Sequence, residues 1–251
     1  MDLSQSCAVV TGGASGLGAA VARHLVDAGG TVMIFDRDAT RGAEAADTIG
    51  AGFVPVDVTD EASVTGGIAA ARASMGKISV LVNCAGIATG EKTVGREGPH
   101  ALDSFRRTID INLVGSFNCL RLAADVMAAN DPNEDGERGV VINTASVAAF
   151  DGQKGQTAYA ASKAGVAALS LPAARDLARL GIRVNAIAPG LFLTPMLEGL
   201  GPEIVDGLSA DVQFPKRLGR PAEFAALAGH IIENAYLNGT TIRLDGGLRM
   251  P

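Results

Sequence analysis

The sequence contains no tryptophan and few aromatic residues of any kind. Aromatics make up 4% of its 251 residues while hydrophobic residues reach 47%, so we expect an aliphatic core rich in alanine. Long apolar runs are also lacking, because none approaches the roughly 20 residues that a membrane-spanning helix needs. The first predicted strand begins within about six residues of the start, which leaves no room for a signal or transit peptide. We therefore expect a soluble protein without a membrane partner, located in the cytoplasm; a mitochondrial location stays open for a eukaryotic source.

Cysteine and net positive charge are scarce as well. The three cysteines, Cys7, Cys84 and Cys119, lack the paired spacing of a metal site, which favours reduced core residues in a reducing compartment. The three histidines are equally scattered, and no metal site is predicted. The formal net charge of −6 argues against nucleic acid as the main partner.

Strand and helix patterns alternate along the whole chain. Strands are predicted near residues 7–11, 31–36, 52–56, 79–84, 139–144, 182–188 and 241–244, with helices between them. This alternation predicts one α/β domain over residues 1–251: a Rossmann-type doubly wound parallel β-sheet of about seven strands, flanked by helices on both faces. A helix after residue 157 is expected to kink at Pro172 and to run on to Leu180.

Three stretches lack a strand or helix pattern. Residues 88–100 and 130–138 are predicted loops. Residues 189–214 follow a strand end, where a doubly wound fold forms its substrate crevice, so we expect a mobile substrate lid there.

A glycine-rich turn follows the first predicted strand and opens a helix. Gly12, Gly16 and Gly18 have the spacing GxxxGxG, with Ser15 and Leu17 beside them. Glycines allow a tight turn and a close approach of a pyrophosphate to the helix N-terminus. The spacing differs from the common GxGxxG pattern and a flexible turn can look similar, so the signal is weak by itself.

An acidic residue ends the second predicted strand. Asp36 lies eighteen residues after Gly18, where a carboxylate is expected on the adenosine ribose hydroxyls. It would repel the extra phosphate of NADP, and no Lys or Arg occurs between Cys7 and Ala22 to bind that phosphate. NAD is therefore the expected cofactor, although Arg37 could still pair with a phosphate.

Two further strand ends complete the predicted nucleotide site. Asp57 is placed to meet the adenine amino group; its alternative role is to cap the next helix, for which Asp60 is the better candidate. The strand near residues 79–84 ends in three small residues, Cys84, Ala85 and Gly86, whose backbone can lie against a cofactor.

Tyr159 and Lys163 lie four residues apart and so share one face of a helix. Lowering a tyrosine pKa from about 10 to about 7 takes about 4 kcal/mol. An ammonium about 4 Å away, at an effective dielectric of about 20, supplies about that much. Ser146 can donate a hydrogen bond to a carbonyl oxygen or hold an alcohol. Tyr and Lys often occur at this spacing by chance, but with a nucleotide loop the set predicts interconversion of an alcohol and a ketone.

Together these motifs resemble the short-chain dehydrogenase/reductase family over essentially the whole chain. The residues that carry the resemblance are Thr11, Gly12, Gly16, Gly18, Asn83 to Gly86, Asn112, Ser146, Tyr159, Lys163, Pro189 and Gly190. Cys84 departs from the pattern, since the family commonly has a second Asn there. Residues 144–153, 171–178, 188–192, 214–219 and 238–250 are more narrowly similar to the 3-hydroxyacyl-CoA dehydrogenases of the family. The resemblance implies an NAD-dependent oxidoreductase acting on 3-hydroxyacyl-CoA or another secondary alcohol.

The resemblance also implies roles for individual residues. Those expected to touch NAD are Ser15, Leu17, Asp36, Asp57, Val58, Cys84, Tyr159, Lys163 and Phe192. On the substrate side, Ser146 orients the reacting oxygen, Gln153 is a weaker candidate, and ionised Tyr159 takes the hydroxyl proton. Lys163 is expected to lower the tyrosine pKa and to bind the nicotinamide ribose.

Four further expectations accompany the resemblance. Asn112 resembles a residue that holds a water for proton relay, with an ordinary polar helix residue as the alternative. Pro189 belongs to the cofactor side, and Thr194 could hold the nicotinamide carboxamide or be a plain loop residue. A homotetramer is implied, and small apolar side chains around residues 160–169 suit helix packing between subunits.

A CoA substrate would need cations for its phosphates. Candidates near the crevice mouth are Lys92, Arg96, Lys154, Lys216 and Arg217, each of which could equally be a solvated surface residue. A 3-oxoacyl-carrier-protein reductase or hydroxysteroid dehydrogenase of the same fold is the nearest alternative, and a non-catalytic scaffold is another. Carrier-protein reductases usually carry a basic residue in the glycine loop, which this chain lacks.

Overall fold

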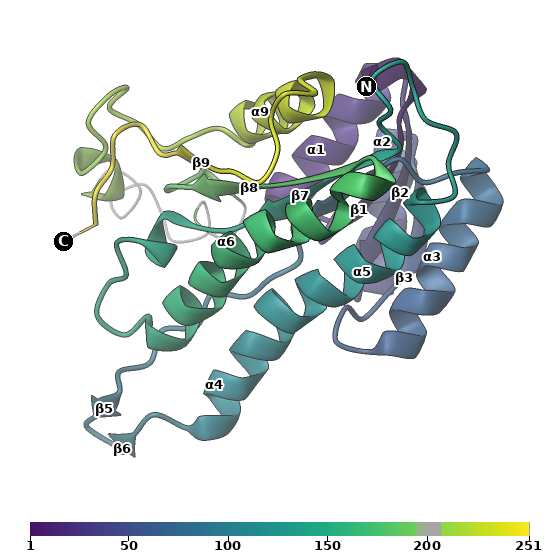
Figure 1. The fold of residues 1–251 in the computed structure, drawn as a ribbon. Helices are drawn as coiled ribbons and strands as arrows, with labels where there is room; N and C mark the ends of the chain where they lie inside the picture. The colour runs from purple at the N-terminus through teal and green to yellow at the C-terminus, as the bar shows by residue number, and fades with distance from the viewer. Residues whose placement is uncertain (195–196, 198–206, 251) are drawn as a thin grey trace.

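The computed structural model describes residues 1–194, 197 and 207–250 (Figure 1). Its centre is a seven-stranded parallel sheet with the order β3-β2-β1-β4-β7-β8-β9. The strands are β1 (Cys7–Thr11), β2 (Thr31–Asp36), β3 (Gly52–Pro55), β4 (Val80–Asn83), β7 (Gly139–Thr144), β8 (Ile182–Pro189) and β9 (Thr241–Leu244). The predicted doubly wound sheet is confirmed, with only small shifts at strand ends. Each strand is nearly all buried or half-buried because helices cover both faces.

Among the described residues there are seven α-helices of eight residues or more. They are α1 (Gly16–Asp27), α2 (Ala39–Ile49), α3 (Glu61–Met75), α4 (Leu102–Ile109), α5 (Gly115–Met127), α6 (Thr157–Leu177) and α9 (Pro221–Glu233). One aliphatic core joins α1, α2 and α9 to one face of the sheet, and a second joins α3, α5 and part of α6 to the other. Both cores are mostly aliphatic, as the composition predicts, with Phe192 and Phe224 in the first and Phe35 in the second. None of the described helices has the length and hydropathy of a membrane span.

Helix N-termini differ in a way that matters for the site. Asp38 caps α2 by accepting from the Arg41 N–H, and Asp60 caps α3 by accepting from Ala62 and Ser63. The start of α1 has no side-chain cap: the hydroxyl of Ser15, its N-cap residue, makes no capping bond. Uncapped N–H groups at a helix start can bind an anion. Because the Asp60 side chain makes the capping bonds of α3, the alternative that Asp57 caps this helix is wrong.

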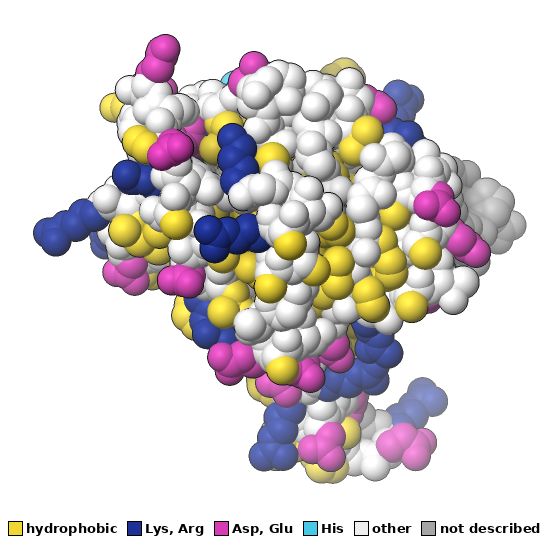
Figure 2. All heavy atoms as spheres, turned by 90° about the vertical axis from the view of Figure 1, so that its right-hand side faces the viewer, with side chains coloured by type: hydrophobic (Ala, Val, Ile, Leu, Met, Phe, Trp, Pro, Cys, Tyr) yellow, Lys and Arg dark blue, Asp and Glu magenta, His cyan; other side chains and the backbone are white. Residues whose placement is uncertain are grey.

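The irregular stretches match the sequence in part. Residues 88–100 contain a short two-stranded ribbon of β5 (Val94–Gly95) and β6 (Gly98–Pro99), which projects with α4 at the lower end of the molecule (Figure 1). Charged side chains gather at that end, and hydrophobic ones lie across the middle of the face shown in Figure 2. Residues 130–138 form a loop, as predicted. Of the expected lid, residues 195–196 and 198–206 lie outside the described residues.

Helix α6 continues through Pro172 to Leu177 and then tightens into a 3-10 turn, Ala178–Leu180. The prediction that the helical segment runs to Leu180 is thus confirmed, with its last turn wound more tightly. Pro172 lies on the exposed side of the helix. Its expected kink stays a prediction.

Candidate active site

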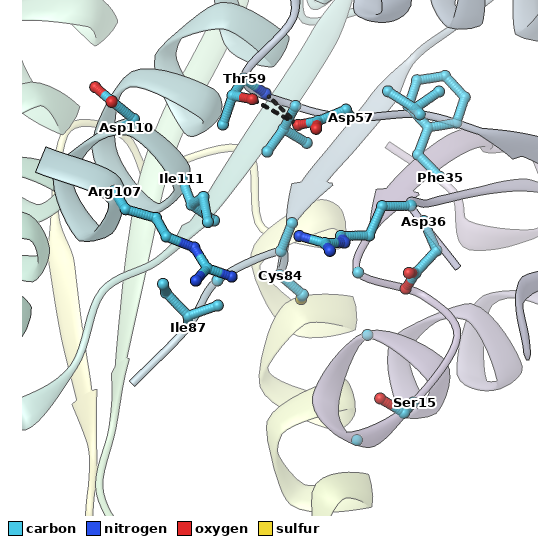
Figure 3. Close-up of a pocket in the computed structure, with 18 of the residues that line it drawn as sticks. Ser15, Phe35, Asp36, Asp57, Thr59, Cys84, Ile87, Arg107, Asp110 and Ile111 are labelled. Carbon is cyan, nitrogen blue, oxygen red and sulfur yellow. Dashed lines mark hydrogen bonds between the residues drawn. The ribbon is translucent and has the colours of Figure 1, made fainter. Parts of the chain in front are cut away.

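A cavity of about 1140 Å³ opens at the carboxyl ends of β1 to β4 (Figure 3). This is the edge at which doubly wound sheets bind nucleotides, and the volume suits a dinucleotide. Most of the predicted cofactor residues line it together: Gly12, Ser15, Gly16, Leu17, Gly18, Asp36, Asp57, Val58, Cys84, Ala85, Gly86 and Thr194. The fold thus gathers in one place residues that are far apart in the sequence.

The glycine loop is packed too tightly for side chains at two positions. Gly12 has a φ of +65°, and a Cβ there would lie 2.7 Å from the backbone nitrogen of Ala85. A Cβ on Gly18 would collide with the carbonyl oxygen of Gly12. The hydroxyl of Thr11 accepts from the backbone N–H groups of Cys84 and Ala85, at 3.2 and 3.1 Å. These contacts fix the ends of β1 and β4 against each other below the cavity.

Asp36 connects the end of β2 to the glycine loop. Its carboxylate accepts from the backbone N–H of Ala14 at 3.2 Å and from that of Asp38 at 3.1 Å. Arg37 and Arg41 line the same cavity. Arg37 is the one cation expected here from the sequence; Arg41 lies on the next helix, outside the glycine loop, and is an addition from the structure.

Asp57 is held as an acceptor at the end of the cavity formed by β3. It accepts from the Thr59 hydroxyl at 2.7 Å and from the Thr59 N–H at 2.9 Å (Figure 3). These hydrogen bonds hold the pKa of Asp57 below its usual range, with a smaller contribution from Arg37. A fixed carboxylate with free lone pairs can accept from an amino group, which is the chemistry expected for adenine.

Three candidate catalytic side chains come from β7 and α6. Ser146 follows β7 and is buried, with its hydroxyl accepting from the Ala148 N–H at 3.1 Å. Tyr159 and Lys163 lie in the first two turns of α6, and the Lys163 ammonium is 5.9 Å from the centre of the Tyr159 ring. Lys163 Nζ donates to the backbone carbonyl of Thr144 at 2.7 Å. The predicted helix face and the pairing with Ser146 are therefore present.

The pKa values of Tyr159 and Lys163 differ from those expected from the sequence. Burial raises the pKa of Tyr159, and a hydrogen bond with Ser146 acts in the opposite direction. Burial also lowers the pKa of Lys163 to about 8. The expectation that Lys163 brings the Tyr159 pKa to near 7 is wrong for the protein by itself. The attraction between the two charges is opposed by the loss of hydration that both groups suffer on burial.

Asn112 lies in a π-helical turn, Asp110–Val114, between α4 and α5. It is fully buried; its amide oxygen accepts from Ile87 N–H at 2.8 Å, and its amide nitrogen donates to Ile87 O at 2.9 Å and to the Ser162 hydroxyl at 3.0 Å. The Asn112 side chain therefore holds the backbone after β4 against α6. This is more than an ordinary polar helix residue, and the water relay stays a prediction.

Cys84 behaves as a small packing residue at the cavity wall. Burial raises the pKa of its thiol to about 11, and the sulfur accepts from the Thr144 hydroxyl at 3.5 Å. A protonated thiol is a weak nucleophile. The departure from the family's Asn therefore adds no reactive group.

Seven predicted site residues do not line the cavity. Four of them, Ser146, Tyr159, Lys163 and Asn112, are described above, and the other three are Phe192, Pro189 and Gln153. The Phe192 side chain is buried in the core, edge-on to Phe224 with ring centres 6.3 Å apart, so only its backbone is left for a cofactor. Pro189 is the buried last residue of β8, and Gln153 is exposed on the surface. Their roles stay predictions.

The expected CoA cations are also outside the cavity. Lys92, Arg96 and Lys154 are exposed, and Lys216 donates to the Ala210 carbonyl at 3.2 Å. Arg217 pairs with the Glu223 carboxylate at 2.6 Å, which holds the pKa of Glu223 at about 2.

Other groups that shape the site are absent from the sequence prediction. Arg106 and Arg107 of α4 line the cavity, and Figure 3 shows the Arg107 guanidinium directed toward Ile87. A helix with charges at successive positions gives no signal for which of them faces inward. The Thr144 carbonyl is a backbone group and has no sequence signal at all. Ser162 stands beside Lys163 and could have been noted from that position. Within the described part of the chain, no cluster of metal-binding side chains occurs.

Comparison with known proteins gives a consistent result. A family model described as short chain dehydrogenase matches residues 6–204. The chain is 50% identical to 3-hydroxyacyl-CoA dehydrogenase type-2 of Drosophila melanogaster, covering 99% of each. It is 51% identical to the Homo sapiens protein of that name, covering 97% of this chain and 95% of the human one. A crystal structure of 3-hydroxyacyl-CoA dehydrogenase type-2 from Mycobacterium avium superposes with a TM-score of 0.93 at 46% identity, covering 97% of this chain and 96% of that chain.

Proposed function

The chain belongs to the short chain dehydrogenase family, and we propose that it oxidises 3-hydroxyacyl-CoA thioesters to 3-oxoacyl-CoA with NAD. The observation that carries the proposal is identity of about half over nearly the full length to relatives named for that activity. The candidate catalytic residues support it, because Ser146, Tyr159 and Lys163 are all present and adjacent. The carrier-protein and steroid alternatives have no such support.

The family implies a nicotinamide cofactor, and we propose that it is NAD. The cavity fits such a group, because Gly16 of the glycine loop lines it and the start of α1, which this loop opens, has no side-chain cap. The Asp36 carboxylate at the end of β2 supports NAD over NADP, since it would repel an added phosphate. The guanidinium groups of Arg37 and Arg41 would attract that phosphate, so we expect NADP to bind more weakly than NAD but not to be excluded.

In the proposed reaction the chain's residues hold the alcohol and move its proton. Ser146 Oγ binds the substrate oxygen, and Tyr159 Oη, as the phenolate, takes the hydroxyl proton. Lys163 is held by the Thr144 carbonyl beside Tyr159, where its charge favours the phenolate. The bound cofactor supplies the hydride acceptor and a positive charge. Since burial raises the pKa of Tyr159, oxidation should become faster as pH rises.

Assembly and location belong to the same proposal. Three large hydrophobic side chains are exposed: Val114 in the turn between α4 and α5 (47%), Phe117 on α5 (50%) and Leu171 on α6 (44%). Together with the small side chains of residues 160–169, they support a homotetramer, which light scattering would test. The three cysteines are free thiols, which supports a reducing compartment such as the cytoplasm.

The test is NADH formation with 3-hydroxyacyl-CoA thioesters of several chain lengths, beside hydroxysteroids and simple secondary alcohols. We expect the highest kcat/KM on a thioester, and a higher kcat/KM with NAD than with NADP. Turnover restricted to carrier-protein thioesters or steroids would contradict the proposed substrate. A lack of turnover on every compound, with NAD still bound, would contradict the enzyme assignment.

A further inference from the structure

A cluster of charges outside the cavity joins three segments of the substrate side. Arg243 of β9 donates from Nη2 to the Asp151 carboxylate at 2.6 Å and from Nε to the Asp245 carboxylate at 2.7 Å. Its Nη2 also donates to the backbone carbonyl of Leu248 at 3.1 Å, and its guanidinium lies 5.5 Å from the centre of the Phe150 ring. One side chain thus holds the strand that carries it, the loop after Ser146 and the turn that follows β9.

Asp151 occupies a sensitive place in the loop between Ser146 and α6. Its backbone N–H donates to Val147 O at 2.9 Å, the same carbonyl that accepts from Phe150 N–H at the end of the short 3-10 turn Val147–Ala149, whose N-cap residue is Ser146. Eight residues later the same loop reaches Tyr159. A shift of Asp151 would therefore move the backbone that sets the distance between the two catalytic hydroxyls.

The turn at residues 245–248 also holds the described ends of the 189–214 stretch. At the start of the 189–214 stretch, the Gly190 N–H donates to the Leu244 carbonyl at 2.9 Å, and a Cβ on Gly190 would lie 2.9 Å from the Asp245 Cα. At its end, the N–H groups of Gln213 and Phe214 donate to the Gly246 carbonyl at 3.1 and 3.0 Å. The position of this turn therefore sets where the stretch begins and ends.

The side chain of Asp245 fixes the turn to Arg243. One carboxylate oxygen accepts from the Gly247 N–H at 3.0 Å, while the other binds Arg243 and Arg249. The side chains of Arg243, Asp151 and Asp245 are 23%, 18% and 10% exposed, so solvent screens these bonds less than surface pairs. A planar guanidinium can donate in two directions at fixed angles, which a lysine ammonium cannot reproduce.

From these contacts we propose that Arg243 is a positioning residue for the thioester substrate. It couples the loop of residues 146–156 to both described ends of the 189–214 stretch, and so sets how the substrate lies against Ser146 and Tyr159. None of Arg243, Asp151 and Asp245 lines the dinucleotide cavity, and of the described residues 189–194 and 207–214 only Thr194 does, so we expect the loss of Arg243 to affect NAD binding much less than thioester turnover. The choice of a thioester as the substrate rests on the proposed function.

The test compares Arg243→Lys and Asp151→Asn with a matched pair elsewhere. Arg121 and Glu61 form an ion pair at 2.9 Å between α5 and α3, away from the substrate side, and Arg121→Lys is the control. In the two test variants we expect kcat/KM for the thioester to fall about 10- to 100-fold, with a much smaller change in the Kd for NAD. The double variant should lose no more than the larger single loss, because both changes break one coupling. Arg121→Lys should change neither quantity.

A second measurement needs no substrate. Hydrogen exchange of the NAD complex should become faster in residues 146–156 and 207–214 of Arg243→Lys, and stay unchanged there in Arg121→Lys. Unchanged exchange in both segments overturns the positioning role, as does an equal loss of thioester kcat/KM and NAD affinity. If the wild-type protein turns over no thioester, the proposed function fails, while the exchange result still decides the role of Arg243.

Discussion

The nucleotide half and the catalytic half of the molecule are built in different ways. Around the cavity, the acids Asp36 and Asp57 are already fixed by nearby backbone groups, and the glycine loop packs closely against the backbone after β4. On the catalytic side, Tyr159 is half-buried and Lys163 is buried, and both pKa values are shifted toward the neutral forms. The first half is set up to bind at little cost, whereas the second holds groups whose charged forms are disfavoured until a ligand is present. The arrangement that allows catalysis therefore lowers the stability of the folded protein.

The strongest test of this contrast is Tyr159→Phe, which removes the catalytic hydroxyl and leaves the cavity intact. We expect turnover to fall by about 10²- to 10⁴-fold, because proton transfer is lost, with NAD affinity nearly unchanged. The measurement is NADH formation together with an NAD titration. Tyr236→Phe is the matched control, since Tyr236 is fully exposed and is the other tyrosine of the chain. Retention of most activity in Tyr159→Phe would remove Tyr159 from the role of base.

Lys163→Met examines the cost of the buried charge. Folding lowers the Lys163 pKa from 10.5 to about 8, so the unfolded chain binds more protons between those values. The destabilisation is therefore full below about pH 8 and is relieved as pH rises toward 10.5. We expect the variant to be inactive yet more stable at pH 7, by about 1–3 kcal/mol after loss of the bond to Thr144.

Urea unfolding of wild type and Lys163→Met at several pH values measures this effect. The stability difference between them should shrink as pH rises through the same window. A variant less stable than wild type at pH 7 would contradict the assigned cost.

Gly12→Ala tests how tightly the nucleotide half is packed. Gly12 and Gly76 both have positive φ, but a Cβ on Gly76 would meet nothing within 4 Å. Both substitutions place an alanine at positive φ, but only Gly12→Ala adds a contact with Ala85, so the difference between the two variants reports chiefly that contact. We expect Gly12→Ala to lose about 1–3 kcal/mol more stability, along with NAD affinity. Equal losses would show that this contact relaxes freely.

Asp36→Ala should produce the smallest change. Loss of the carboxylate leaves Arg37 and Arg41 at that end of the cavity, so the preference for NAD over NADP should fall by about tenfold. The ratio of kcat/KM values for the two cofactors measures it. Asp47→Ala, an exposed change on α2, is the control, and an unchanged ratio in Asp36→Ala would point to another discriminator.

Local patterns account for most of what could be predicted. Strands such as β2 and β7 were predictable because parallel strands covered on both faces appear as continuous apolar runs. The glycine loop and Asp36 were predictable because their spacing reflects one local strand–turn–helix unit.

Properties that depend on distant packing were not predictable. The raised pKa of Tyr159 comes from burial by the rest of the fold, and Phe192 turns into the core to meet Phe224. The π-helical turn that places Asn112 against Ile87 and Ser162 likewise needs three segments in contact.

The chain's small tyrosine content gives it a built-in optical probe. With no tryptophan and two tyrosines, its near-ultraviolet absorbance comes chiefly from Tyr159 and the fully exposed Tyr236. In Tyr236→Phe, ionisation of the remaining phenol can be followed directly by absorbance as base is added. The acidity of the proposed catalytic base can thus be recorded with and without dinucleotide, with no label attached to the protein.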